Sequence, residues 1–186
     1  MPDHGGNIEQ AARRWGIPAQ DWLDLSTGIS PFPYPVPSLG ADVWRRLPHR
    51  GEALLAAAKD YYGTDEIIAL PGSQAAIQTL PRVLGLNAAA STVAIVSPMF
   101  NEHPHAWRSA GARIRVISPD AILQAASEVD VLLLANPNNP TGDAWEASTL
   151  LAAHEQLAKR GRWLVGDEAF IDARSEEHTS ELPSRE

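Results

Sequence analysis

The order of apolar segments along the 186 residues predicts an α/β fold in which helices cover both faces of an open, mostly parallel sheet. Short apolar runs alternate with stretches whose apolar residues recur at helical spacing, as expected for parallel strands joined by crossover helices. Hydrophobic residues make up 44% of the chain, enough for the core of one ordinary domain. Ligands of such sheets bind beyond the carboxyl ends of the strands, where we therefore expect the functional residues.

Local patterns predict the individual elements. A short helix is expected between Asn7, an N-cap candidate that Gln10 can answer, and the stop signal at Gly16. Residues 24–37, rich in Pro, Ser and Gly, are expected to be irregular. Strands are expected at 66–70, 92–97, 113–118, 130–135 and 163–167. Helices are expected at 54–62, at 73–84 with an interruption at Pro81, around Ala106, at 121–126 and at 150–158.

Composition disfavours several classes of partner. The 15 Lys and Arg face 23 Asp and Glu, and the net charge of -8 with no basic run argues against a nucleic-acid partner. The chain has no cysteine, which is compatible with a reducing cytosol. The first residues lack the pattern of a secretory signal, and the longest apolar run, 131–135, is too short to span a bilayer. We expect a cytoplasmic protein with no membrane partner.

The first expected strand end carries an anion-site pattern. In LPGSQAAIQ, Gly72 and Ser73 turn the chain directly into a helix, whose first N–H groups can bind an anion. Ser73 can instead serve only as the N-cap of that helix. The segment contains no P-loop, no dinucleotide fingerprint and no GxSxG motif.

Three further strand ends carry an aromatic ring, an amide and a carboxylate. The segment SPMFNEHPH places Phe100 and His103 at one edge, Phe100 either as a platform for a ring or as core. His103 and His105 make a poor metal site, because no third ligand is evident. The string NPNNPTG, 136–142, is either a turn fixed by Pro or a device that aims an Asn amide above the sheet. Asp167 ends the last strand and requires a cation or a protonated nitrogen if it is buried.

Together these features match pyridoxal phosphate, which has a phosphate, a flat ring, a phenolic oxygen and a pyridine nitrogen that must stay protonated. The motifs HGGNI, DLSTGISPFPYP, GSQAAIQTLPR, EHPHAW, NPNNPTG and DEAFID resemble the large domain of fold-type I pyridoxal-phosphate enzymes, the aspartate aminotransferase superfamily. Within it they are similar to the threonine-phosphate decarboxylase branch of cobalamin biosynthesis. The resemblance covers residues 3 to about 173 and implies a three-layer, mostly parallel sheet.

The resemblance also implies a role for each matching residue. Ser73 and Gln74 would hold the cofactor phosphate, and Phe100 would stack on the ring. Asn139 would bond the phenolic oxygen, while Asp167, supported by His103, would pair with the pyridinium nitrogen. Gly28 and Ile29 would approach the substrate carboxylate, and His4 would reach a substrate phosphate unless it is simply a solvated terminal residue.

Two positions depart from many relatives. A tyrosine near the phenolic oxygen is replaced by Phe170, so Asn139 would make that contact alone. The Tyr-Pro pair that reaches across a dimer to the cofactor phosphate is replaced by Leu47 and Pro48. Both differences favour the decarboxylase branch.

The expected activity is decarboxylation of L-threonine O-3-phosphate to 1-amino-2-propanol phosphate by a homodimer of the parent enzyme. One alternative is a histidinol-phosphate-type aminotransferase, and the other is a binding module without catalysis. The chain has only two lysines, Lys59 and Lys159, both expected at helix ends away from the strand ends. The resemblance places the lysine that binds the cofactor covalently beyond the DEAF segment, so no catalytic residue is assigned here.

We therefore expect an inactive amino-terminal fragment with three parts. Residues 1–40 would form an N-terminal helix and substrate loop, 41–173 a partial cofactor-binding large domain, and 174–186 a non-native or disordered tail. The tail, SEEHTSELPSRE preceded by an arginine, is unlike the family and reads like the translation of a sequencing adapter. The alternative is a natural, disordered C-terminus.

Overall fold

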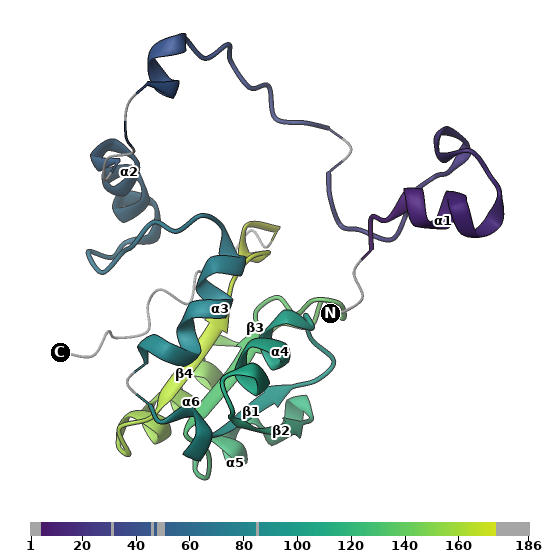
Figure 1. The fold of residues 1–186 in the computed structure, drawn as a ribbon. Helices are drawn as coiled ribbons and strands as arrows, with labels where there is room; N and C mark the ends of the chain where they lie inside the picture. Colours follow the sequence, from purple (N-terminus) through teal and green to yellow (C-terminus); the bar gives the residue numbers. More distant parts are fainter. Residues whose placement is uncertain (1–4, 31, 46, 48–50, 85, 174–186) are drawn as a thin grey trace. The chain divides into compact units, whose positions relative to one another are not determined.

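The computed structural model describes residues 5–30, 32–45, 47, 51–84 and 86–173, and the chain divides after residue 50 into two units (Figure 1). The sequence placed this boundary ten residues earlier, after residue 40. His4, Pro48 and the expected tail at 174–186 lie outside the described residues. Among the described residues, no helix is both long and apolar enough to cross a membrane.

The first unit contains the expected opening helix, α1 (Ile8–Trp15). The Asn7 side chain accepts a hydrogen bond from the Gln10 N–H at 3.1 Å, and Gly16 ends the helix in the left-handed conformation, with φ at 68°. Two 3-10 turns follow, η1 (Ala19–Asp21) and η2 (Ala41–Trp44). The described residues between them are irregular, as predicted.

The second unit is built on a four-stranded sheet of β1 (Thr92–Val96), β2 (Arg113–Ile117), β3 (Val131–Ala135) and β4 (Trp163–Asp167). The strand order is β2-β1-β3-β4, and every neighbouring pair is parallel. All four carboxyl ends therefore lie along the same edge. The mostly parallel α/β sheet predicted from the sequence is confirmed.

Helices cover this sheet on both faces. In chain order the helices are α2 (Glu52–Tyr62), α3 (Ser73–Val83), α4 (Glu102–Ser109), α5 (Ile122–Ala126) and α6 (Ala147–Ala158), with the 3-10 turns η3 (Ala88–Ala90), η4 (Pro119–Ala121) and η5 (Ile171–Ala173). The chain moves outward from β1 to β2 and then returns past β1 to β3 and β4. Because crossovers are right-handed, this reversal places α4 on one face and α5 and α6 on the other (Figure 1). The helix α3 packs on α4.

Alternate residues of each central strand enter two separate cores. On β1, Ala94 and Val96 face α5 and α6, whereas Val93 and Ile95 face α4. Trp107 anchors α4 to its side of the sheet and is 1% exposed. Burial on both faces explains why the central strands are continuous apolar runs.

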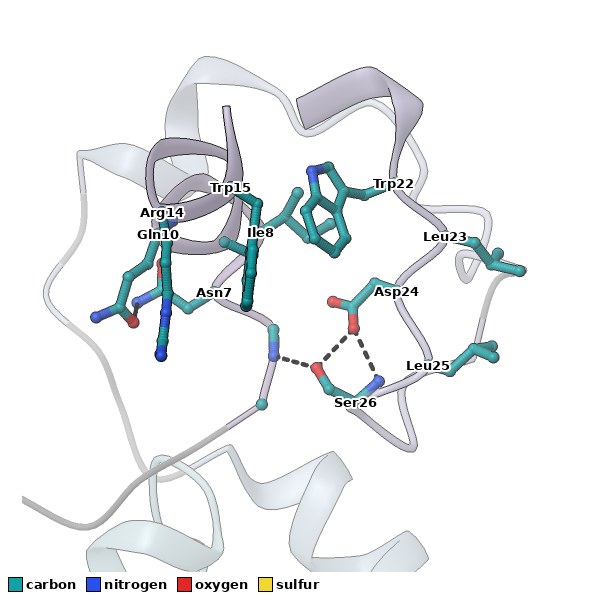
Figure 2. Close-up of a pocket in the computed structure, with 13 residues that line it drawn as sticks. Asn7, Ile8, Gln10, Arg14, Trp15, Trp22, Leu23, Asp24, Leu25 and Ser26 are labelled. Atoms are coloured by element: carbon teal, nitrogen blue, oxygen red, sulfur yellow. Dashed lines mark hydrogen bonds between the residues drawn. The ribbon is translucent and has the colours of Figure 1, made fainter. Parts of the chain in front are cut away.

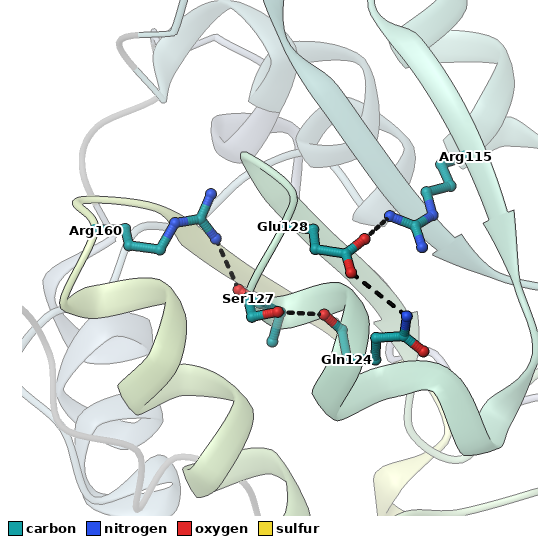
Figure 3. Close-up of polar contacts among 6 residues, drawn as sticks. Arg115, Gln124, Ser127, Glu128 and Arg160 are labelled. Carbon is teal, nitrogen blue, oxygen red and sulfur yellow. Dashed lines mark hydrogen bonds and ion pairs between the residues drawn. The ribbon is translucent and has the colours of Figure 1, made fainter.

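A polar network fixes the short helix α5 to its neighbours (Figure 3). Arg115 on β2 pairs with Glu128, which also accepts a hydrogen bond from Gln124. Ser127 donates to the Gln124 carbonyl at 2.7 Å, and Arg160, just beyond α6, donates to the Ala126 carbonyl at 2.9 Å. Side-chain donors thus satisfy carbonyls at the end of a helix only five residues long.

Two expectations are wrong. Residues 66–70 form no strand, and Ile68 is 78% exposed. An apolar run becomes a strand only where a neighbour pairs with its N–H and C=O groups, and no strand of the sheet lies beside this one. Pro81 does not interrupt its helix, because it lies in the last turn of α3. Its side chain is buried, and the helix ends two residues later, at Val83.

Leu132 at the centre of β3 tests this packing. Leu132→Ala should lower the free energy of unfolding by about 2–5 kcal/mol, because the side chain is fully buried in the core that β3 forms with α5 and α6. Leu54→Ala on exposed α2 should change it by less than about 0.5 kcal/mol. Urea unfolding measures both values, and equal losses in the two variants would contradict the assigned core.

Candidate functional site

A cavity of about 190 Å³ opens at the carboxyl edge of the sheet. The residues that line it come from the start of α3, from the segment after β1, and from the ends of β3 and β4 and the segments that follow: Ser73, Phe100, Ala135, Pro137, Asn139, Asp167, Ala169 and Phe170. After β1 the chain turns towards β2, whereas after β3 it turns towards β4. The segments that leave these adjacent strands therefore diverge, which opens a crevice for a ligand.

A hydrogen-bonded pair places a carboxylate in this cavity. Asp167 Oδ2 lies 2.7 Å from His103 Nε2, and Asp167 Oδ1 accepts the Ala169 N–H at 3.0 Å. The His103 hydrogen bond lowers the pKa of Asp167 most; partial burial opposes this shift, and the Ala169 N–H adds to it. Asp167 is therefore ionised at neutral pH despite its burial.

His103 supports this carboxylate from behind the cavity wall. Its side chain is 3% exposed, and its ring meets Phe100 edge-on, with centroids 6.4 Å apart. Because an ionised Asp167 can only accept, Nε2 carries the proton of that bond. The other ring nitrogen, Nδ1, is buried and has no partner in the described part of the chain.

The start of α3 forms another part of the cavity. Its N-cap residue is Gly72, with φ at 87°, and no side chain caps the helix. Ser73 is the first helical residue, so the alternative in which Ser73 is the N-cap is wrong. The Gln74 side chain does not line the cavity but donates to Glu102 Oε2 at 2.6 Å. Its backbone N–H remains at the helix start, where an anion is favoured.

The three asparagines of the 136–142 turn have different environments. Buried Asn136 accepts the Trp145 N–H through its side chain at 3.2 Å. Buried Asn138 donates to the Pro98 carbonyl and to Thr141, each at 2.8 Å. Only Asn139 lines the cavity. Two of the asparagines therefore hold the turn together, and the third lines the cavity.

The structure brings Ser73, Phe100, Asn139 and Asp167 together around one cavity, with His103 and Gln74 adjoining it. Gly28 and the exposed Ile29 lie in the first unit and do not line this cavity. Sequence reasoning did not select Ala135, Pro137 or Ala169. Each of them is a direct or near neighbour of a predicted strand end, and that proximity was the available signal.

Neither lysine lines the cavity. Lys59, in the last turn of α2, pairs with Asp65 at 3.1 Å. Lys159 ends α6, and the chain after it enters β4 at its amino end, opposite the cavity edge. No primary amine of the described side chains is therefore placed at the site.

The first unit has its own hollow, of about 590 Å³, between α1 and residues 22–26 (Figure 2). The Gly6 N–H donates to Ser26 Oγ at 2.8 Å, and Ser26 Oγ donates to Asp24 at 2.6 Å. A side chain on Gly5 would lie 1.9 Å from the Ser26 carbonyl, so this approach requires glycine. These polar groups bond to one another and join the HGGNI and DLSTG motifs, so we assign the hollow a structural role.

The Asp167 pair predicts a pH dependence. A depressed pKa in the folded state stabilises the fold above about pH 4, the unfolded value, and this contribution is lost as pH falls through the lower folded pKa. Asp167→Asn removes that titration. Its free energy of unfolding should be about 1–2 kcal/mol below that of the wild type at pH 7, and this difference should shrink below pH 4. Urea unfolding from pH 3 to 7 measures the difference, and a constant gap would contradict the lowered pKa.

Curated proteins resemble this chain over most of its length. The chain is 48% identical over 172 residues to a threonine-phosphate decarboxylase of Pseudomonas aeruginosa, covering 92% of this chain and 51% of that protein. It is 41% identical over 174 residues to a threonine-phosphate decarboxylase of a Sinorhizobium species, covering 91% and 50%. The chain thus spans about half the length of these relatives.

Solved structures share the fold. The L-threonine-O-3-phosphate decarboxylase of Porphyromonas gingivalis superposes with a TM-score of 0.56 at 22% identity, over 67% of this chain and 38% of that one. The protein MppP, soaked with 2-ketoarginine, superposes with a TM-score of 0.55 at 26% identity, over 70% and 40%. Residues 47–183 match the family model of aminotransferases class I and II. This chain belongs to the aminotransferase class I and II family.

Proposed function

We propose that the protein containing this chain is a pyridoxal-phosphate-dependent decarboxylase of L-threonine O-3-phosphate, producing 1-amino-2-propanol phosphate for cobalamin biosynthesis in the cytoplasm. The observation that carries the proposal is the ionised Asp167, held by buried His103 in a cavity with an aromatic ring, an amide and an open helix start. The threonine-phosphate decarboxylases at 48% and 41% identity support the choice of substrate.

The cavity residues fit pyridoxal phosphate. Asp167 would hold a proton on the pyridine nitrogen, because an ionised carboxylate favours a cation beside it. Ser73 and the first N–H groups of α3 would bind the phosphate, and Phe100 would cover a ring face. When bound, the cofactor supplies a ring that withdraws electrons from the Cα bonds of an amino acid.

The remaining residues would determine orientation. Asn139 would donate to the phenolic oxygen, unaided by Phe170, which has no hydroxyl group. We further propose that, in a homodimer, Gly28 and Ile29 contact the substrate carboxylate and His4 contacts the substrate phosphate. Under this proposal, residues 1–40 are the substrate segment, 41–173 are part of the cofactor domain and 174–186 are a tail.

A histidinol-phosphate aminotransferase is the second candidate, because such an enzyme of Aeromonas salmonicida is 27% identical over 174 residues. The full-length protein should release carbon dioxide and 1-amino-2-propanol phosphate from L-threonine O-3-phosphate, as followed by product analysis. A keto product from histidinol phosphate, without carbon dioxide release, would favour the aminotransferase instead.

Asp167→Asn in the full-length protein should lower kcat/KM by roughly 100-fold or more, because an amide cannot stabilise the protonated ring nitrogen. The matched control is Asp65→Asn, at a carboxylate that is 93% exposed. Near-normal turnover of Asp167→Asn would refute the role of this residue, whereas equal losses in both variants would indicate a general effect on the fold.

The 186-residue chain itself should bind the cofactor only reversibly, because Lys59 and Lys159 lie away from the cavity. Borohydride reduction followed by peptide mapping should recover no site-specific adduct, and no carbon dioxide should form. Specific trapping on one lysine together with sustained product release would show that the position of the reactive amine is misassigned.

A further inference from the structure

A buried carboxylate outside the cavity contacts α3, the helix whose first residue lines the cavity. Glu102, the first residue of α4, is 6% exposed and accepts a hydrogen bond from Gln74 Nε2 at 2.6 Å. Neither side chain lines the cavity, and the two residues lie 28 positions apart in the sequence. A buried carboxylate is costly unless polar groups satisfy it, so this contact is a specific one.

The contact compensates for the uncapped start of α3. A Ser, Thr or Asp at the N-cap would occupy one of the first N–H groups of the helix, but the N-cap here is Gly72 and no side chain caps the helix. The Ala75 N–H donates to the Gly72 carbonyl, whereas the Ser73 and Gln74 N–H groups remain for a ligand, and the turn lacks the support of a side-chain cap. Glu102 holds the second residue of that turn through its side chain and leaves the backbone N–H groups available.

The next residue of α4 acts on the opposite end of the cavity. His103 Nε2 lies 2.7 Å from Asp167 Oδ2, so two consecutive residues contact the two polar ends of the site. Trp107, one turn further along α4, is 1% exposed and packs the helix onto the sheet. The start of α4 therefore sets the separation between the start of α3 and the Asp167 carboxylate.

We propose that Glu102 is a positioning residue for the phosphate of the ligand, because it holds the first turn of α3 through Gln74 at a defined distance from Asp167. The inference rests on the proposed binding of pyridoxal phosphate, and it assigns to Glu102 no contact with the cofactor.

The first test compares two ligands that differ only in the phosphate. The affinities of the 186-residue chain for pyridoxal phosphate and for pyridoxal are measured by titration, and their ratio reports the phosphate contact. Glu102→Ala should reduce this ratio by about tenfold, as expected for the loss of one hydrogen bond to a charged group. Glu102→Gln, which retains an acceptor oxygen, should preserve the ratio. Gln78→Ala, at an exposed residue one turn further along α3, should preserve it too.

A double-mutant cycle tests the route through Gln74. If Glu102 acts through this side chain, Gln74→Ala with Glu102→Ala should lower the ratio no further than Glu102→Ala alone. A ratio unchanged by Glu102→Ala, or fully additive losses, would overturn the proposal. If Glu102 only stabilised the fold, Glu102→Ala would weaken the binding of both ligands equally and leave the ratio unchanged. That result would also overturn the proposal.

Hydrogen exchange tests, without any ligand, whether the Glu102–Gln74 contact holds the first turn of α3. The Ile77 and Gln78 amides bond to the carbonyls of the first two residues of α3, by the geometry of an α-helix. Glu102→Ala should speed their exchange about fivefold or more, while Glu102→Gln leaves it unchanged. Unchanged exchange in Glu102→Ala overturns the positioning role. If the wild type shows no preference for pyridoxal phosphate over pyridoxal, the proposed function fails. Faster exchange in Glu102→Ala would then still show that Glu102 holds the first turn of α3 through Gln74.

Discussion

Parallel pairing of the four strands is the constraint on which the site depends. Parallel neighbours have all their carboxyl ends at one edge, so segments far apart in the sequence meet there. The reversal of the chain between β2 and β3 opens a crevice at that edge and distributes the helices over both faces. The cavity is therefore a consequence of the strand order, which the two apolar cores stabilise.

Burial makes unpaired polar groups costly at this edge, and several of these groups form hydrogen bonds with one another or with nearby backbone. Asp167 accepts hydrogen bonds from His103 and the Ala169 N–H, and Asn136 accepts the Trp145 N–H. The Asn138 amide donates to the Pro98 carbonyl and to Thr141, while Asn138 Oδ1 and His103 Nδ1 have no partner among the described residues. These bonds leave Asn139 and one side of Asp167 directed towards the cavity. Rigid positioning of such groups before a ligand arrives is what electrostatic recognition requires.

The helix α4 connects this polar edge to the apolar core. One side of it packs on the sheet through Trp107, and its first two residues contact α3 and β4. A change in the packing of α4 would therefore move both contacts together. The segment after β3 is held separately by Asn138 and the Pro98 carbonyl.

The sequence by itself determined the sheet, most helix positions and the residue types at the strand ends, because burial on two faces imposes continuous apolar runs such as 131–135 and helical spacing between them. Only the tertiary structure decided that 66–70 is not a strand, since a strand needs a partner. It also decided which asparagine reaches the cavity and that Glu102 holds Gln74. Such contacts join residues distant in the chain, and their geometry depends on how the elements pack rather than on any local pattern.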